Sequence, residues 1–371
     1  MRLLVVSILL CALSPVDGIT AHPDMSKTLR DIEKIASGDD DVELIGDIID
    51  RGQTAVGKTV ADILRERQPA QHFGPKYPPP GPPGSRECNA DPCCVWAHVS
   101  NALTALFLER DGQCNDNARA AVRAGFHDAA TWHKGLGFGG ADGSLALSPF
   151  EIHRIENNGL EDIVYKLKDL REMFNVGMAD MFQFAATHAA VSCPLGPRIR
   201  VFVGRKDSDR TPPIGLIPTP FATADRIIRF FRNKTIPPQD LVALLGAHTV
   251  SKQFFVNLKR AGAPQDSTPG VWDVLYYKQT LGENLQPEVF RFQSDINVSK
   301  DRRTEEKFRD FAGRQSQERW NEDYARAYLR LSLLGVDNIN SLTECTQALP
   351  DQRREFAVSD PVDAENAPAS E

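Results

Sequence analysis

Apolar residues recur every three or four positions over much of the chain, the spacing that places them on one face of a helix. This pattern predicts helices over residues 95–109, 117–132, 161–174 and 178–192. Pro237-Pro238-Gln239-Asp240 is a typical helix start, so a further helix is expected over residues 241–250. Strand patterns are scarce, and residues 198–204 are the best candidate for a short strand. The pattern therefore predicts a mainly α fold.

The pattern changes towards both ends and divides the chain into four predicted parts. Residues 1–18 have a basic start, an apolar run and small residues, which is typical of a signal peptide; the alternative is the start of a mature helix. Residues 19–87 form a polar extension with one or two short helices between 44 and 64, and they end in the proline-rich linker 78–84. Residues 88–345 are expected to form one compact domain, and residues 346–371 an acidic C-terminal tail whose end, 360–371, is expected to be disordered.

Composition limits the classes of partner. The chain is 41% hydrophobic and 25% charged, so it can bury a sizeable core. A net charge of −7 and a pI of about 5.7 argue against binding to nucleic acid or to an anionic membrane. No segment after the predicted signal peptide is long and apolar enough to span a membrane, so we expect a soluble, secreted protein.

Cysteine usage agrees with an oxidising compartment. Cys11 falls within the predicted signal peptide, and the even number that remains favours three disulfides, although the sequence alone leaves fifteen pairings open. The remaining cysteines are Cys88, Cys93, Cys94, Cys114, Cys193 and Cys345. Asn233 and Asn297 begin N-x-S/T triplets and are candidate glycan acceptors.

Arg123 and His127 are four residues apart on a predicted helix and so share one face. A histidine can accept a proton from a peroxide and return it to the leaving oxygen, while a fixed arginine stabilises the negative charge that develops there. Such a pair is more often a surface or packing pair when it stands alone. An asparagine amide such as Asn157 could accept a hydrogen bond from Nδ1 of His127 and keep Nε2 free as the base.

Oxygen-bearing residues adjoin His127 and a second histidine, His248. Asp128 and the glycine-rich loop 139–144 could hold a hard cation such as Ca²⁺, or the loop could be a solvated turn. His248 lies in an apolar helical stretch, where a histidine is usually a buried core residue. However, carboxylates and hydroxyls over residues 266–273, with Thr249, have spacings suited to a second Ca²⁺ shell, and Asp295 could reach the other ring nitrogen of His248.

These motifs, in this order, resemble the secreted fungal class II haem peroxidases of the plant-peroxidase superfamily, over residues 88–345. The shared motifs are Cys93-Cys94-Val95-Trp96, R-x-x-F-H-D at Arg123, G-A-D-G-S after Gly139, the segment 215–221, A-H-T at Ala247, D-S-T-P-G-x-x-D at Asp266 and Q-S-D at Gln293. The resemblance implies a plant-type haem peroxidase fold, in which two helical subdomains sandwich haem b.

The resemblance also implies a role for each residue of the motifs. His248 is then the axial ligand of haem b and Asp295 its hydrogen-bond partner, while His127 is the acid–base and Arg123 the charge stabiliser. Asn157 orients His127, and Glu151 links this network to a distal Ca²⁺. The distal Ca²⁺ ligands are expected to be Asp128, Gly140, Asp142 and Ser144, and the proximal ones Thr249, Asp266, Thr268, Val271 (carbonyl) and Asp273. The implied disulfides are Cys88–Cys94, Cys93–Cys345 and Cys114–Cys193.

The chain departs from the family pattern at positions that decide the substrate. A fourth disulfide has no cysteines here. The three carboxylates of a manganese site align with Asp116, Ala120 and Phe254, which leaves one carboxylate where Mn²⁺ needs several oxygens. The surface tryptophan of lignin peroxidases aligns with Ala243. Trp272 could relay a radical, although a buried tryptophan is more often a packing residue.

The resulting hypothesis is a peroxidase that uses hydrogen peroxide, through a ferryl porphyrin radical, to oxidise small phenolic or aromatic donors in one-electron steps. The protein is expected to be a monomer with haem b and two Ca²⁺ ions. One alternative is a haem- and calcium-binding module without catalysis, which would not need Arg123 and His127. Others are an intracellular-type relative that oxidises ascorbate or cytochrome c, and a zinc enzyme built on His127 and His133, whose spacing of six places them on different helix faces.

Overall fold

The computed structural model describes residues 42–354, and residues 43–354 belong to one compact unit. The predicted signal peptide and the acidic segment 360–371 lie outside the described residues. Helices dominate, as predicted: α2 (Ala55–Leu64), α3 (Arg86–Asn89), α4 (Cys94–Phe107), α5 (Asp116–Ala129), α6 (Ser144–Leu147), α7 (Glu161–Phe174), α8 (Met178–Ser192), α9 (Ala224–Arg232), α10 (Pro238–Leu245), α11 (Leu275–Leu281), α12 (Gln293–Ser299), α13 (Glu305–Ala312) and α14 (Gln317–Leu331). No helix among residues 42–354 is long and apolar enough to cross a membrane.

Strands contribute only two small antiparallel pairs within the described part of the chain. β1 (Phe202–Val203) lies inside the predicted strand 198–204 and pairs with β4 (Thr343–Glu344), with Phe202 opposite Glu344. β2 (Lys252–Gln253) pairs with β3 (Ala263–Pro264). Because these strands are two residues long, helix packing rather than a sheet defines the fold.

Local signals set the helix ends. α7 and α8 have the predicted bounds, and α4 and α5 begin one residue earlier than predicted. The side chain of Asn115 accepts hydrogen bonds from the first turn of α5, as an N-cap residue does. α10 begins at Pro238 as expected, but it ends at Leu245 and continues as a 3-10 turn, Gly246–Val250. A Cβ on Gly246 would lie within 2.5 Å of Tyr277 and Trp320, so this turn approaches its neighbours too closely for any other residue.

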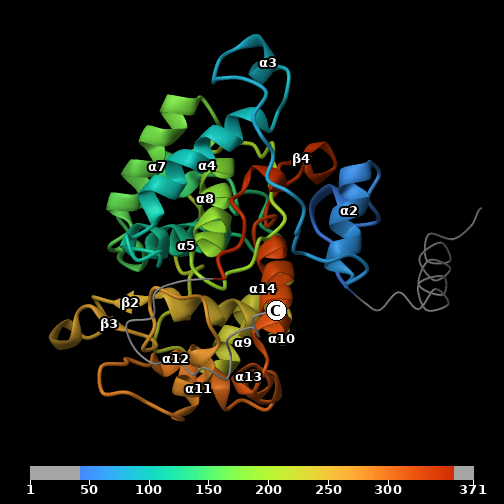
Figure 1. Ribbon diagram of the computed structural model, residues 1–371. Coiled ribbons are helices and arrows are strands. Elements are labelled where there is room, and N and C mark those ends of the chain that lie inside the picture. Colours follow the sequence, from blue (N-terminus) through green and yellow to red (C-terminus); the bar gives the residue numbers. More distant parts are fainter. Residues whose placement is uncertain (1–41, 355–371) are drawn as a thin grey trace, which may run out of the picture. The chain divides into compact units, whose positions relative to one another are not determined.

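The helices form two groups (Figure 1). In the first, α8 packs against α4, α5 and α7. Every residue of α8 is buried, which explains its apolar, alanine-rich sequence. A Cβ on Gly125 of α5 would lie 2.5 Å from the Cβ of Ala186, so glycine permits the close approach of α5 and α8. In the second group α9, α13 and α14 pack against α10, while α11 packs against α12 and α13.

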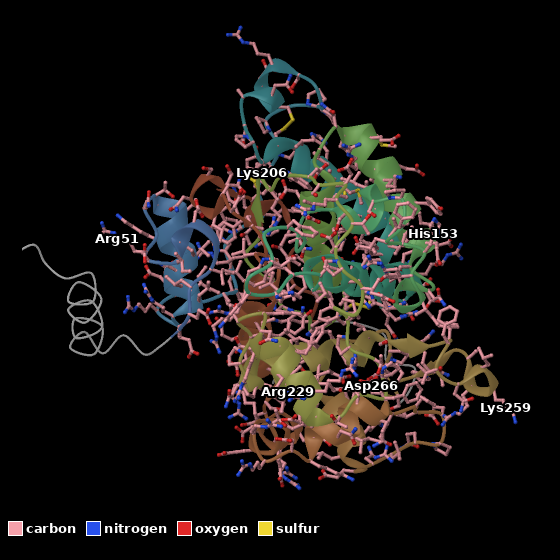
Figure 2. The ribbon with its side chains drawn as sticks, turned by 180° about the vertical axis from the view of Figure 1, so that it is seen from behind. Arg51, His153, Lys206, Arg229, Lys259 and Asp266 are labelled. Carbon is pink, nitrogen blue, oxygen red and sulfur yellow. A yellow bond between two sulfur atoms is a disulfide. The ribbon has the colours of Figure 1, made fainter. Side chains whose placement is uncertain are left out.

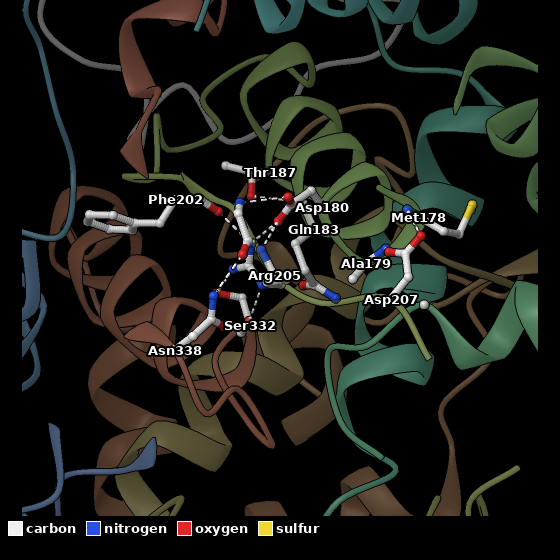
Figure 3. A network of polar contacts seen from close by, with 12 residues as sticks. Met178, Ala179, Asp180, Gln183, Thr187, Phe202, Arg205, Asp207, Ser332 and Asn338 are labelled. Atoms are coloured by element: carbon white, nitrogen blue, oxygen red, sulfur yellow. Dashed lines mark hydrogen bonds and ion pairs between the residues drawn. The ribbon is translucent and has the colours of Figure 1, made fainter. Parts of the chain in front are cut away.

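A buried ion pair joins the first group to the end of α14 (Figure 3). The carboxylate of Asp180 lies 2.9 Å from Nη1 of Arg205 and accepts a hydrogen bond from the N–H of Gly204 at 2.7 Å. Nε of Arg205 donates to the carbonyl of Ser332 at 2.9 Å. The carboxylate of Asp207 accepts from the N–H groups of the first two residues of α8, both at 2.9 Å, and so caps this helix.

The segment before the proline-rich stretch is part of the compact unit, which differs from the predicted boundary at residue 87. Ile48, Val60 and Ile63 are buried, and α2 packs against α14 and the 3-10 turn Ile339–Ser341. Oδ1 of Asn340 accepts hydrogen bonds from the backbone before α2, at 2.8 and 3.2 Å. The apolar face of this extension needed a partner, and the C-terminal helix supplies it.

The end of the domain also differs from the prediction. Thr346, Ala348 and Leu349, which were assigned to an acidic tail, are buried. The three disulfides join the pairs that the family resemblance implied: Cys88–Cys94, Cys93–Cys345 and Cys114–Cys193. Cys93–Cys345 ties α4 to this C-terminal segment, so the predicted tail begins too early.

Candidate active site

Arg123 and His127 project from the same face of α5, as their spacing predicted. Nε of Arg123 donates to Nε2 of His127 at 3.3 Å, and the imidazole is only 7% exposed. The guanidinium is held by the backbone carbonyls of Glu156 and Asn158, at 2.8 and 2.9 Å. Carbonyl oxygens fix the position of the guanidinium without neutralising its charge, so the cation remains available to an anion beside His127.

The structure also brings Asn157 to this pair. Oδ1 of Asn157 lies 2.7 Å from Nδ1 of His127, and Nδ2 donates to the carbonyl of Glu151 at 2.7 Å. Because the amide oxygen can only accept, Nδ1 carries the proton and Nε2 is an acceptor. Burial, together with the nearby charge of Arg123, lowers the pKa of His127 to about 3. The imidazole is therefore a neutral base with Nε2 facing Arg123.

Asp128, Asp142 and Ser144 converge in the loop that follows α5. The buried carboxylate of Asp128 accepts hydrogen bonds from the N–H groups of Gly143 and Leu145, at 3.2 and 3.3 Å. Burial and the neighbouring carboxylates of Asp142 and Glu151 raise the pKa of Asp128 well above its usual value. The carboxylate oxygens of Asp128 and Asp142, together with the hydroxyl and carbonyl oxygens of the loop, are the kinds of donor that a hard cation prefers.

Other members of the distal set also fit a cation. Oγ of Ser144 and Oε2 of Glu151 are buried and have no hydrogen-bond partner among the described residues. Gly140 has a φ of +101°, and a Cβ there would lie 2.1 Å from the carbonyl of Leu334, so the loop requires glycine. Glu151 connects the histidine pair with the cation ligands. Its backbone carbonyl accepts a hydrogen bond from Nδ2 of Asn157, and its carboxyl group lies beside Ser144.

His248 lies on the 3-10 turn that continues α10. Nδ1 of His248 is 2.8 Å from Oδ2 of Asp295, a carboxylate in the first turn of α12 that is 2% exposed. The His248 side chain itself is 32% exposed, and no hydrogen bond to its Nε2 is found within residues 42–354. An imidazole fixed at Nδ1 with an accessible Nε2 fits an axial ligand of haem.

Two further side chains bind Asp295, and sequence reasoning predicted neither contact. The hydroxyl of Tyr276 donates to Oδ2 at 2.9 Å, and Oγ of Ser294 donates to Oδ1 at 2.9 Å. Tyr276 is also in edge contact with the His248 ring, with centroids 5.8 Å apart. Tyr276 and Asp295 are nineteen positions apart in the sequence, and no spacing rule connects them.

All the residues of the predicted proximal set lie together. The hydroxyl of Thr249 donates to Asp266 at 2.5 Å and lies 3.4 Å from the carbonyl of Val271. The hydroxyl of Thr268 donates to Asp273 at 2.8 Å. Burial and the charge of Asp273 raise the pKa of Asp266 well above its usual value. Asp266 is fully buried, whereas Lys259 projects at the edge of the molecule (Figure 2). Two buried carboxylates with hydroxyl and carbonyl oxygens around them fit a second hard cation.

The structure shows the surroundings of the residues that align with the manganese site and the surface tryptophan of the family, and of Trp272. Asp116 forms an ion pair with Arg119 and lies 3.6 Å from Lys252, so two cations already surround the single carboxylate of the manganese position. Phe254 is partly exposed, and Ala243 is fully buried. Trp272 is fully buried and stacks on Trp320, with centroids 5.3 Å apart. This environment agrees with packing as its main role.

No zinc site is formed by His127 and His133 in the described structure. Nδ1 of His133 instead lies 2.7 Å from the carbonyl of Lys134. Within residues 42–354, the one cluster of three histidine, cysteine or carboxylate groups close enough to share a metal is Cys88, Cys94 and His98, and its two cysteines form a disulfide.

Comparisons with known proteins identify the family to which this chain belongs. The family model "Peroxidase" matches residues 95–314. The chain is 32% identical to a peroxidase of Arthromyces ramosus, over 72% of this chain and 79% of that protein. It is 33% identical to ligninase C of Trametes versicolor (71% of this chain, 76% of the relative) and 30% identical to manganese peroxidase 3 of Phlebia radiata (69% and 76%). The chain therefore belongs to the peroxidase family, within the plant-peroxidase superfamily.

Proposed function

We propose that this peroxidase reduces hydrogen peroxide at a haem b bound through His248 and then oxidises small phenolic or related aromatic donors in one-electron steps. Membership of the family supports an enzyme that uses hydrogen peroxide to oxidise substrates. The observation that carries the haem assignment is the His248–Asp295 pair, in which Nδ1 is fixed at 2.8 Å and Nε2 is left accessible. Haem, when bound there, supplies the electrons that reduce the peroxide.

His127 is the proton carrier in this proposal. Its lowered pKa keeps Nε2 unprotonated, so that it can accept the proton of an incoming peroxide and deliver it to the departing oxygen. The hydrogen bond from Nδ1 to Asn157 is then strengthened, because the imidazole becomes positively charged. Arg123, held by two backbone carbonyls, stabilises the negative charge on the leaving oxygen.

Two Ca²⁺ ions are proposed as structural cofactors. The distal ion would be bound by Asp128, Gly140, Asp142 and Ser144, and the proximal ion by Thr249, Asp266, Thr268, Val271 and Asp273. Asp128 and Thr249 directly follow the two catalytic histidines in sequence. Each ion would relieve the repulsion between buried carboxylates and so fix the segment that carries a histidine.

We propose small donors because this chain has neither the full set of carboxylates for Mn²⁺ nor the surface tryptophan used for bulky substrates. Ala120 and Phe254 supply no carboxylate for Mn²⁺, and Asp116 is already paired with Arg119. Ala243 offers no aromatic ring at the position of the surface tryptophan. We further propose that the protein is a monomer and that it is secreted; the three disulfides support secretion.

The test compares three single variants of the full chain after reconstitution with haem. His248→Ala is expected to lose most of the haem-bound Soret absorbance. His127→Leu should retain haem but react with hydrogen peroxide orders of magnitude more slowly in stopped flow. His153→Leu, at an exposed histidine, serves as the control and should behave as wild type. Haem retention in His248→Ala, or unchanged peroxide kinetics in His127→Leu, would refute the assigned roles.

The donor class is tested separately by turnover of a phenol, of Mn²⁺ and of a high-potential aromatic under the same conditions. We expect turnover of the phenol alone. Efficient oxidation of Mn²⁺ would contradict the argument from Asp116, Ala120 and Phe254.

A further inference from the structure

Asp295 is shared by two donors at a single oxygen atom. Nδ1 of His248 lies 2.8 Å from Oδ2, and the hydroxyl of Tyr276 lies 2.9 Å from the same Oδ2. The other oxygen, Oδ1, accepts from Ser294 at 2.9 Å. His248 and Tyr276 therefore compete for one carboxylate oxygen, while the second oxygen has its own partner.

Burial strengthens the effect of both donors on the Asp295 carboxylate. Tyr276 is 1% exposed and Asp295 2% exposed, so bulk water does not compete for the carboxylate. The Tyr276 ring is fixed by edge contacts with His248 and with Tyr277, with centroids 5.8 and 5.2 Å apart. In a buried site of low polarity, a hydrogen bond to a carboxylate is stronger than in water. The phenol is thus held in position to donate.

We propose that Tyr276 is a positioning residue that sets the electron donation of His248 to the haem iron, by drawing charge from the shared oxygen of Asp295. This inference rests on the proposed function, in which His248 is the axial ligand. A carboxylate that accepts the Nδ1 proton of an axial histidine makes the imidazole more basic and favours the oxidised metal. Donation from Tyr276 to the same oxygen weakens that pull, so the wild-type iron is easier to reduce than it would be without the phenol.

The alternative is that Tyr276 only fills space in the aromatic core. Tyr277, the adjacent and equally buried tyrosine, distinguishes the two cases. Its hydroxyl donates to the carbonyl of Val242 at 2.9 Å and has no hydrogen bond to Asp295 among the described contacts. Tyr276→Phe and Tyr277→Phe each remove one buried hydroxyl from neighbouring rings, but only the first changes the environment of Asp295.

The experiment measures the reduction potential of the haem-loaded full chain by spectroelectrochemical titration, and the iron–histidine vibration of the reduced form by resonance Raman. Tyr276→Phe should shift the reduction equilibrium towards the oxidised state by on the order of tenfold, about 59 mV for one electron. The iron–histidine frequency should rise. Tyr277→Phe should leave both quantities at their wild-type values.

A variant of unchanged shape gives the opposite sign and covers the case in which Tyr276→Phe does not fold. 3-Fluorotyrosine placed at position 276 has a more acidic phenol and donates more strongly, so it should raise the potential. In an Asp295→Asn background the change at position 276 should lose its effect, because the shared carboxylate is gone.

Each outcome decides the inference. A wild-type potential in Tyr276→Phe, or equal shifts in Tyr276→Phe and Tyr277→Phe, overturns it. His248→Ala separates this failure from failure of the proposed function. If the iron–histidine vibration persists in His248→Ala, both the ligand assignment and the inference are wrong. If it disappears there but does not move in Tyr276→Phe, only the role of Tyr276 is wrong.

Discussion

Replacing Asn157 with leucine tests how much of the peroxide reaction depends on the orientation of His127. The substitution removes the 2.7 Å hydrogen bond between Oδ1 and Nδ1 of His127, and with it the group that fixes the tautomer. It also removes the donor to the carbonyl of Glu151 at 2.7 Å. Loss of the bond to His127 should slow the reaction with peroxide, and loss of the bond to the Glu151 carbonyl should lower the free energy of unfolding.

The expected rate effect follows from the change in charge of His127 during the reaction. A hydrogen bond from a neutral group contributes about 0.5–1.5 kcal/mol, and one from a charged group about 1.5–3 kcal/mol. The imidazole is neutral before it accepts the proton and positive afterwards, so the differential loss is about 1–1.5 kcal/mol. At about 1.36 kcal/mol per tenfold, Asn157→Leu should slow the reaction with peroxide roughly tenfold. Leaving the Glu151 carbonyl unsatisfied should lower the free energy of unfolding by about 1–3 kcal/mol.

The assay is the second-order rate constant for hydrogen peroxide in stopped flow, with the thermal midpoint measured in parallel. His127→Leu and the double variant with both substitutions, His127→Leu and Asn157→Leu, complete a double-mutant cycle. If Asn157 acts through His127, the double variant should be no slower than His127→Leu. Additive effects on the logarithm of the rate, or a rate for Asn157→Leu within twofold of wild type, would refute the reasoning.

The remaining predictions concern stability. Lys234 is 1% exposed, and burial lowers its pKa from 10.5 to about 7. The unfolded chain binds this proton up to about pH 10.5, but the folded chain binds it only below about pH 7. The buried lysine therefore lowers the free energy of unfolding increasingly as pH falls from about 10.5 to about 7. Below about pH 7 the loss reaches roughly 5 kcal/mol. Lys234→Met should therefore raise the free energy of unfolding by about 3 kcal/mol at pH 6 and by much less at pH 10. The value at pH 6 allows for loss of the hydrogen bond from Lys234 to the Trp132 carbonyl. Equal effects at the two pH values in chemical denaturation would contradict this. Chelation of Ca²⁺ should lower the thermal midpoint, because an ion at 100 times its Kd contributes about 2.7 kcal/mol and its removal leaves Asp128 and Asp266 facing other carboxylates. An unchanged midpoint after verified metal removal would exclude structural calcium.

Most of the helices and the contact between Arg123 and His127 could be predicted from local signals. Helical spacing gave the bounds of α7 and α8, because burial of one helix face imposes a periodic pattern. The spacing of four also placed Arg123 and His127 on one face of α5, and the structure shows their side chains in contact. The proximal set was found by its motif, and all five of its residues lie together.

Other features depended on residues far apart in the sequence, where no periodicity applies. The apolar positions of α2 predict a helix but not its partner, so the sequence pattern alone does not show that the segment before the proline-rich stretch packs against the domain. The sequence could place Asp295 beside His248 by family resemblance, but it gave no reason to connect Tyr276 with either.

The sequence by itself determined the helical class and pointed to the candidate catalytic residues and the two candidate sets of cation ligands, because each depends on short spacings within one element or loop. Only the tertiary structure decided where the domain begins and ends, which carbonyls hold Arg123, and which phenol shares the carboxylate that binds His248. These contacts join segments that meet only when the helices pack, and the geometry of packing is not written in the spacing of residues along the chain.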